Sequence, residues 1–123
     1  DNENNKIAVV NRSAYDLWLT NNYKKAKIVR AKTIIETHNL FYNQDVNILA
    51  GLKPKLLEEL KNNNEFKLID EPFTFIKQSI GIKKGKPKAI DFINNFVSKK
   101  IKDGTIKSLL EKYELVDKLS IPV

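Results

Sequence analysis

The sequence has no cysteine and no methionine among its 123 residues. Without cysteine, neither a disulfide framework nor a thiolate metal site is available, although the compartment stays open. Without methionine there is no initiator, so we expect a processed protein or a piece of one. Apolar runs such as Ile48–Leu52 fall far short of the roughly 20 residues that cross a bilayer. No signal peptide or anchor is visible, and removal of one from the upstream side stays open.

Negative charge is also scarce, since the formal net charge is +7. The lysines form only small clusters, and no stacking aromatic side chains are interleaved with them. A solvated, lysine-rich surface explains this placement better than a nucleic-acid interface does, so we expect no nucleic-acid partner. A hydrophobic fraction of 41% and a charged fraction of 30% are typical of an ordinary globular protein.

Strand and helix patterns alternate through the first half of the chain. Apolar segments predict strands at residues 6–10, 27–31, 46–50 and 66–69. Between them, amphipathic patterns predict helices at residues 14–22, at 33–43, and from Pro54 to the polar turn 62–64. This order predicts an α/β fold with a mostly parallel sheet flanked by helices.

The pattern changes after residue 72. Residues 73–82 read as a long extended stretch, and a polar loop follows at Lys83–Lys86. Two helices are then predicted, over 87–103 and 105–113, with Gly104 as a natural stop between them. Their apolar faces have no obvious sheet of their own to cover, so they pack either on the first half or on a partner.

The segment from Val9 to Leu19 is the most informative part of the chain, because it reads as a strand, a polar turn and a helix that opens at Ser13. Such a turn directs free backbone N–H groups and a hydroxyl at one spot, which suits a carboxylate or phosphate. A plain N-cap at Ser13 explains the same residues without a ligand. In parallel sheets, ligands bind beyond the carboxyl ends of the strands, where Asn11–Ala14 and Gly51–Lys53 both fall.

Four segments in order resemble the bacterial extracellular solute-binding proteins of the polar amino-acid type (family 3), which feed ABC importers. Ile7–Val10 followed by Ser13–Asp16 is similar to the family's first strand and turn, and Asn47–Lys53 to its Asp-Ala-Leu-Ala-Gly-Val-Arg type of segment. Phe75–Gly85 resembles the returning hinge strand, and the tail through Tyr113 resembles the closing helices. The resemblance covers nearly the whole chain, although no single motif is specific.

The resemblance implies a type II periplasmic-binding-protein lobe. Residues 1–72 correspond to lobe two, residues 73–86 to a hinge strand and loop, and residues 87–123 to helices that return to a lobe one that is mostly absent. It implies a periplasmic or lipid-anchored protein without catalysis or cofactor, whose lobes close on a solute and present it to a membrane permease. The absent lobe would be supplied by another polypeptide or by self-association.

The family's site implies ligand contacts at Ser13 and Ala14, with Arg12 in place of the usual glycine. Further candidates for ligand binding are Asn11, Lys53 and Gln78. Many members have an aspartate near the third strand for an ammonium group, whereas Gly51, Leu52 and Lys53 stand there, so an acidic solute is favoured. Two alternatives stay open: a dehydratase of small cyclic carboxylates and a sensor module. For a dehydratase, the carboxylates lack a matched acid or base, and the only histidine, His38, reads as structural or exposed.

Overall fold

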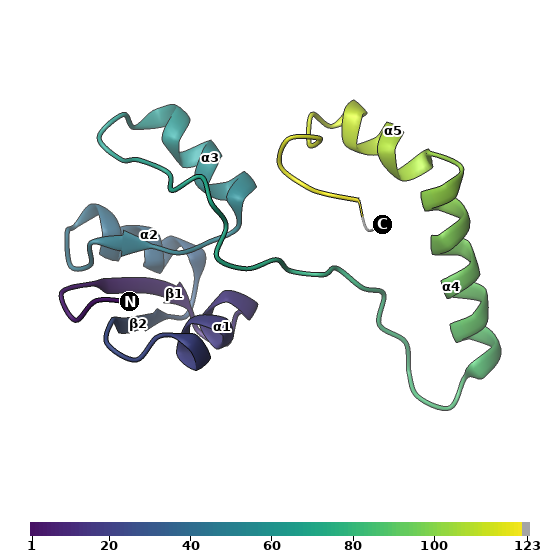
Figure 1. The fold of residues 1–123 in the computed structure, drawn as a ribbon, viewed down its shortest axis with the longest axis horizontal. Coiled ribbons are helices and arrows are strands. Elements are labelled where there is room, and N and C mark those ends of the chain that lie inside the picture. The colour runs from purple at the N-terminus through teal and green to yellow at the C-terminus, as the bar shows by residue number, and fades with distance from the viewer. Residues whose placement is uncertain (122–123) are drawn as a thin grey trace. The chain divides into compact units, whose positions relative to one another are not determined.

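The chain divides into two units, Asp1–Ile76 (unit 1) and Lys77–Val123 (unit 2). The computed structural model describes residues 1–121. Unit 1 has an α/β fold whose three parallel strands follow the order β2-β1-β3 (Figure 1). Its elements are β1 (Lys6–Val10), α1 (Ala14–Asn22), β2 (Lys27–Ala31), α2 (Ile34–Tyr42), β3 (Ile48–Leu49) and α3 (Lys53–Asn62). The predicted α/β class with a parallel sheet and flanking helices is confirmed.

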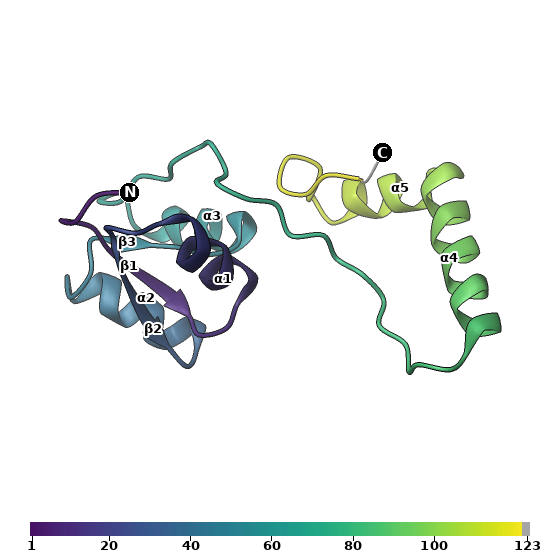
Figure 2. The same cartoon turned by 60° about the horizontal axis from the view of Figure 1, so that its bottom comes forward.

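The core of unit 1 lies around the central strand β1. Ile7, Ala8 and Val9 are buried there, and Leu19 of α1 and Ala50 after β3 pack against them. A strand with three consecutive buried residues is covered on both faces, as a central parallel strand must be. The two helices that do this are α1 and α2, which lie on opposite sides of β1 and β2 (Figures 1 and 2).

The strand order makes β1 the point where the chain reverses its direction across the sheet. From β1 the chain passes to β2 on one side, and from β2 it crosses back to β3 on the other side. The loops that leave β1 and β3 therefore diverge at the carboxyl edge of the sheet. This topological switch point is where open α/β sheets bind ligands.

Asp1, at the N-terminus, is hydrogen-bonded at the amino edge of the sheet, opposite the carboxyl edge. The Asp1 carboxylate accepts hydrogen bonds from the backbone N–H groups of Lys24, Lys25 and Ala26, at 2.8 to 2.9 Å. These three residues directly precede β2, so the contact lies at the amino edge. Three donors converging on one carboxylate hold the segment ahead of β1 in place.

Two predicted strands differ from the structure. Residues 66–69 form no strand, because Phe66 packs on the Phe41 ring of α2, with centroids 4.4 Å apart, instead of extending the sheet. The strand predicted at 46–50 is reduced to Ile48–Leu49, so β3 offers only a short edge for a fourth strand. The stretch 73–82 likewise forms neither helix nor strand.

The helices α1 and α2 each leave a large apolar side chain exposed close to a buried residue. In α1, Leu19 is buried and Leu17 is exposed; in α2, Thr37 is buried and Ile35 is exposed. Each exposed residue lies two positions before the buried one, which is about 200° around the helix. A run of adjacent apolar residues leaves this phase undecided, so the sequence pattern alone does not show which one faces the sheet.

Unit 2 consists of α4 (Pro87–Lys102) and α5 (Thr105–Lys112), which contact each other. Gly104 ends α4 with a φ of 79°, in the left-handed region that glycine adopts freely, which confirms its predicted role. No residue of either helix is buried. Across residues 1–121, no helix combines the length and the apolar character needed to span a membrane.

Candidate functional site

The candidate site lies at the carboxyl edge of the sheet, between the loop after β1 and the loop after β3. The ladder continues slightly past both strands, since Asn11 N–H donates to the Ala31 carbonyl at 2.9 Å and Ala50 N–H donates to the Ala8 carbonyl at 3.0 Å. Asn11–Ala14 and Lys53 therefore follow neighbouring parallel strands at one edge. The structure brings these predicted residues to the same end of the sheet.

Ser13 caps α1 as the sequence predicts. Its Oγ accepts a hydrogen bond from the Asp16 N–H at 3.1 Å, and its carbonyl accepts one from Leu17 N–H. The N–H groups of Ala14 and Tyr15 have no hydrogen-bond partner within residues 1–121. The cap explanation is therefore confirmed for Ser13, while two donors at the same helix end remain available to an anion.

Arg12 has a left-handed backbone, with a φ of 62°. Its N–H donates to Asp16 Oδ2 at 2.8 Å, and this bond holds the turn in a conformation that few side chains adopt without help. The residue is exposed, and its guanidinium makes no ion pair within the described chain. The charge of Arg12 thus remains available at the strand end.

Beneath the turn, the Asp16 carboxylate is almost completely buried. Arg30 of β2 donates to it through Nε at 3.0 and 3.1 Å, and Thr20 Oγ1 donates at 3.2 Å. Arg30 Nη2 lies 3.0 Å from Asp16 Oδ1 and also donates to Thr20. Both oxygens of the carboxylate accept hydrogen bonds from unit 1, so Asp16 serves to hold the turn.

The electrostatics of Asp16 agree with this structural role. Burial raises the pKa of its carboxyl group, but the hydrogen bonds from Arg30, the Arg12 N–H and Thr20, together with the Arg30 charge, outweigh burial. The net pKa is lower than usual, so the group is ionised at neutral pH and neutralised by Arg30. No uncompensated negative charge therefore lies under the Asn11–Ala14 turn.

The other wall of the site is the start of α3. Lys53 is its first residue and is exposed, and its N-cap, Leu52, has no side chain that can accept a hydrogen bond. Gly51 brings this loop close to the helix, because a Cβ there would lie 3.4 Å from Leu56 Cδ2. The N-terminus of α3 thus carries the positive charge of Lys53 and no side chain that caps it.

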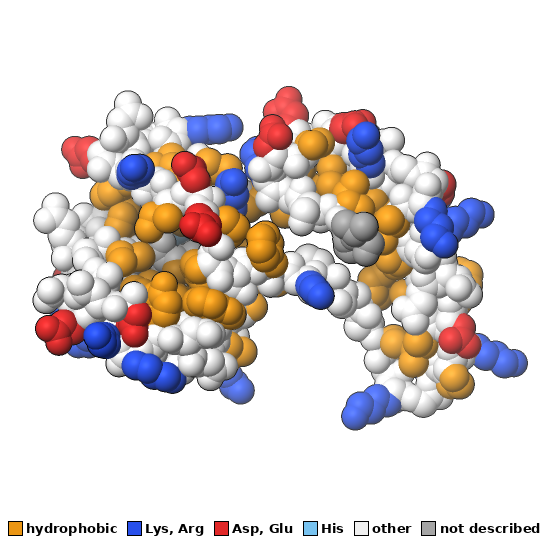
Figure 3. Space-filling model, viewed as in Figure 1, with side chains coloured by type: hydrophobic (Ala, Val, Ile, Leu, Met, Phe, Trp, Pro, Cys, Tyr) orange, Lys and Arg blue, Asp and Glu red, His pale blue; other side chains and the backbone are white. Residues whose placement is uncertain are grey.

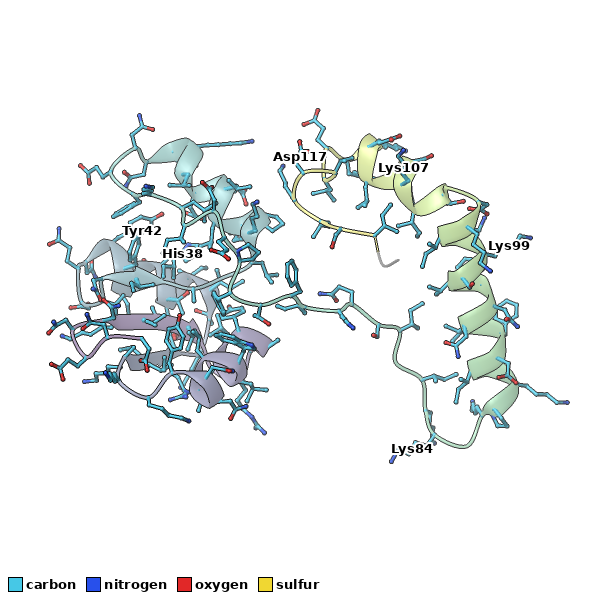
Figure 4. The ribbon with its side chains drawn as sticks, viewed as in Figure 1. His38, Tyr42, Lys84, Lys99, Lys107 and Asp117 are labelled. Atoms are coloured by element: carbon cyan, nitrogen blue, oxygen red, sulfur yellow. The ribbon has the colours of Figure 1, made fainter. Side chains whose placement is uncertain are left out.

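A polar cluster holds α3 against α2. Tyr42 Oη donates to Glu59 Oε2 at 2.6 Å, and Glu59 Oε1 lies 3.3 Å from His38 Nδ1 and 3.6 Å from Lys55 Nζ. Figure 4 shows His38 and Tyr42 side by side on α2. The Tyr42 hydrogen bond is the main reason that the pKa of Glu59 is lowered and that of Tyr42 is raised.

Two other residues considered in the sequence analysis, His38 and Gln78, do not belong to the carboxyl edge of the sheet. His38, the only histidine of the sequence, has a mostly buried side chain whose Nδ1 lies beside Glu59, and its structural role stays a prediction. Gln78 is exposed and belongs to unit 2. Sequence reasoning missed Asp16 and Arg30 as turn-forming residues. The spacing Ser13-x-x-Asp16, a capping-box pattern, was a signal for Asp16, whereas nothing in the sequence marked Arg30.

Two surface hollows in the described part of the chain do not include residues of this edge of the sheet. One is lined by Asn95, Ser98, Lys99, Lys102 and Asp103, and the other by the N-terminal residues and Lys25. Within residues 1–121 there is also no group of three or more side chains suited to a metal ion. Comparison with protein-family models, curated proteins and solved structures finds no match to this chain.

Proposed function

We propose that unit 1 is a ligand-binding lobe that takes a small organic anion at the carboxyl edge of its sheet. The observation that carries the proposal is the switch point between β1 and β3, where α1 begins with two unpaired N–H groups above a neutralised carboxylate and α3 begins with Lys53 and no side-chain cap. Free N–H groups at Ala14 and Tyr15 supply directional donors. Arg12 and Lys53 supply charge.

The charge of the edge favours a carboxylate solute over an amine. The carboxyl edge carries the charges of Arg12, Lys32 and Lys53, and its two carboxylates are both engaged, Asp16 by Arg30 and Glu36 by the Lys32 N–H at 2.8 Å. A solute ammonium group would meet more cations than carboxylates there, and an unpaired buried ammonium is costly. A dicarboxylate or another organic acid fits the same groups well.

The finer fold and setting belong to the same proposal. Unit 1 is the second lobe of a type II periplasmic-binding-protein fold, and the chain is the solute-binding component of an ABC importer in the periplasm, either free or lipid-anchored. Its cycle is binding, hinge closure and docking on the permease, without a catalysed reaction and without a cofactor. The support is the order of motifs in the sequence together with the parallel sheet of unit 1.

A lobe alone provides half of a cleft, so we expect affinity weaker than millimolar in isolation. Succinate titrated at high concentration into ¹⁵N-labelled protein should shift the amide resonances of Ala14, Tyr15 and Lys53, while L-arginine should not. Succinate should also be recovered unchanged after incubation, whereas a dehydratase would convert small carboxylates. Shifts confined to other parts of unit 1 would refute the site, and tight binding to the chain alone would refute the half-cleft.

Arg12→Gly is the sharpest variant for this test. Glycine adopts the left-handed conformation that Arg12 has, so the turn keeps its geometry while the guanidinium is lost. The succinate response at Ala14 should fall several-fold. Lys61→Ala, which removes a lysine from the far end of α3, is the matched control and should leave the response unchanged.

A further inference from the structure

The positive charge of unit 2 is concentrated in one stretch that the proposed function leaves unexplained. This stretch, residues 77–90, is called the basic segment. It contains five lysines and no acidic residue, so its formal charge is +5. The remainder of unit 2, residues 91–123, contains six lysines and five acidic residues, so its formal charge is only +1. Most of the +7 of the whole chain therefore lies in the basic segment.

The five lysines of the basic segment are exposed and unpaired. Within residues 1–121, none of their ammonium groups makes an ion pair or a hydrogen bond. Figure 3 shows basic side chains, in blue, projecting from the stretch that leads into α4. Because no carboxylate of the described chain neutralises them, their charges remain available to an anionic partner. The five are Lys77, Lys83, Lys84, Lys86 and Lys88.

The backbone of the basic segment also lacks partners before α4 begins. Residues 77–86 belong to no helix or strand, and no backbone hydrogen bond within the described chain involves residues 77–85. The N-cap of α4, Lys86, makes no side-chain hydrogen bond, and the first turn of the helix has no acidic residue. The positive end of the α4 dipole therefore adds to the charge of the lysines around it.

Aliphatic side chains are interleaved with these lysines. Ile80 is 59% exposed, Ile90 is 40% exposed and Ile82 is 36% exposed. A sequence that combines lysines with exposed aliphatic residues matches the interface of an anionic bilayer, where phosphates lie next to acyl chains. Lysine suits this boundary, because its methylene stem enters the apolar region while its ammonium group stays beside the phosphates.

We propose that the basic segment binds the surface of an anionic phospholipid bilayer. Its ammonium groups pair with lipid phosphates, and Ile80 and Ile82 enter the boundary between headgroups and acyl chains. Clusters of about four to eight basic residues bind anionic lipid in this way, and each lysine near the surface strengthens binding about fivefold. The proposal does not depend on the binding of an organic anion by unit 1.

The composition of the basic segment favours lipid over two other anionic partners. A nucleic acid is bound by aromatic side chains that stack on bases and by the planar guanidinium of arginine, and the segment contains neither. An acidic protein surface is matched by donors held in a fixed geometry, whereas residues 77–86 form no regular structure. A fluid bilayer imposes no such geometry, because its phosphates move to the lysines.

Sedimentation of the full chain with lipid vesicles tests the proposal. We expect binding to vesicles of equal parts phosphatidylcholine and phosphatidylglycerol, and none to phosphatidylcholine alone. Salt at about 1 M, where the Debye length is about 3 Å, should release the protein. Combining Lys83→Gln with Lys84→Gln should weaken binding about 25-fold. Combining Ile80→Ser with Ile82→Ser should weaken it several-fold, because the aliphatic contact with the acyl chains is lost.

A matched control removes the same charge from the other end of α4. Lys99 and Lys102 are exposed and form no ion pair in the described chain. Figure 4 shows Lys84 before α4 and Lys99 near the far end of that helix. Combining Lys99→Gln with Lys102→Gln should weaken vesicle binding less than about threefold. Far-UV circular dichroism shows whether each variant keeps its helices.

Three results would overturn the proposal. One is a chain that does not sediment with the phosphatidylglycerol vesicles at low salt. Another is equal weakening by the two lysine pairs, which would assign binding to net charge alone. The third is stronger binding to single-stranded DNA or to polyglutamate than to the vesicles at the same charge concentration, which would make the partner a nucleic acid or an acidic protein. Each of these results leaves the succinate response of unit 1 to be judged separately.

Discussion

Units 1 and 2 of this chain differ in how many side chains they bury and in their net charge. Unit 1 buries a parallel sheet between helices and is nearly neutral, with eleven basic and ten acidic residues. Unit 2 has two amphipathic helices, no buried residue in either of them, and a formal charge of +6. Stability in unit 1 therefore comes from tertiary packing, whereas the helices of unit 2 depend on local bonds and on whatever covers their apolar face.

The largest expected difference between the units is the cost of removing a leucine side chain. Leu19→Ala should destabilise unit 1 by about 3 kcal/mol, because Leu19 is fully buried and leaves a cavity. Urea unfolding followed by fluorescence of Trp18, the only tryptophan, reports on unit 1 alone.

Leu109→Ala is the counterpart in unit 2. Leu109 is partly exposed, so its loss should leave the Trp18 transition unchanged within about 0.5 kcal/mol. A shift of the Trp18 transition comparable to that of Leu19→Ala would show that the two units unfold together, and the contrast between them would fail.

The buried carboxylate of unit 1 should have the next largest effect. Asp16→Asn should cost about 2 kcal/mol at pH 7, because Arg30 and the Arg12 N–H lose a charged acceptor. The pKa of Asp16 is lower in the folded state, so its contribution is complete above the unfolded pKa near 4 and is lost as the pH falls through the folded value. The difference in the free energy of unfolding between the wild type and Asp16→Asn should therefore disappear at acid pH.

Asp45→Asn provides the comparison for this pH dependence. Asp45 is exposed, and its side chain has no hydrogen-bond or ion-pair partner in the described part of the chain. Urea midpoints measured from pH 7 to pH 3 should match the wild type. An Asp16→Asn variant whose urea midpoint also matched the wild type at every pH would remove the carboxylate network from the explanation of the turn.

A smaller effect is expected in unit 2, at the turn between its helices. Gly104→Ala places a Cβ at a φ of 79° and should cost about 1 kcal/mol of local helix stability. Amide exchange of α4 and α5 should speed up accordingly. Gly81→Ala, at a position without a positive φ and with open space around it, should leave exchange unchanged. Equal effects of the two variants would show that the turn geometry at Gly104 is unimportant.

The smallest effect concerns the contact between α2 and α3 in unit 1. Tyr42→Phe removes the hydrogen bond to Glu59 and should cost about 0.5 to 1 kcal/mol in the Trp18 transition. Tyr113→Phe is the control from unit 2, because the Tyr113 hydroxyl has no hydrogen-bond partner within residues 1–121. A larger loss for Tyr113→Phe would reverse the order of the two units.

The elements of unit 1 were predictable where the local signals agree. Ser13 and Thr33 mark helix starts by capping, and the bounds of β1, α1 and β2 match the prediction. The strand predicted at 66–69 was wrong, because its apolar residues are equally suited to packing on a helix. Phe66 does this against Phe41 and Tyr42. Periodicity reports that a side chain is buried, but not against which element.

The candidate site was predictable in its position but not in its electrostatics. The strand-turn-helix pattern placed Asn11–Ala14 at the carboxyl edge, and the parallel order added Lys53. Arg30 neutralises Asp16 across 14 residues of sequence, a pairing that depends on the register of β1 and β2. Register is set by long-range packing, so the neutralisation of Asp16 beneath the turn can be seen only in the folded chain.

The hydrogen bonds of Asp1 to the loop before β2 also determine from which side unit 1 can be tethered. A fusion partner or surface linker attached ahead of Asp1 leaves from the amino edge of the sheet. The Asn11–Ala14 and Lys53 loops then face away from the support, open to solutes in the flow. A sensor immobilised in this orientation keeps the hydrogen bonds of the Asp1 carboxylate and leaves the carboxyl edge of the sheet open. Attachment through Lys53 would obstruct the edge where the organic anion is proposed to bind.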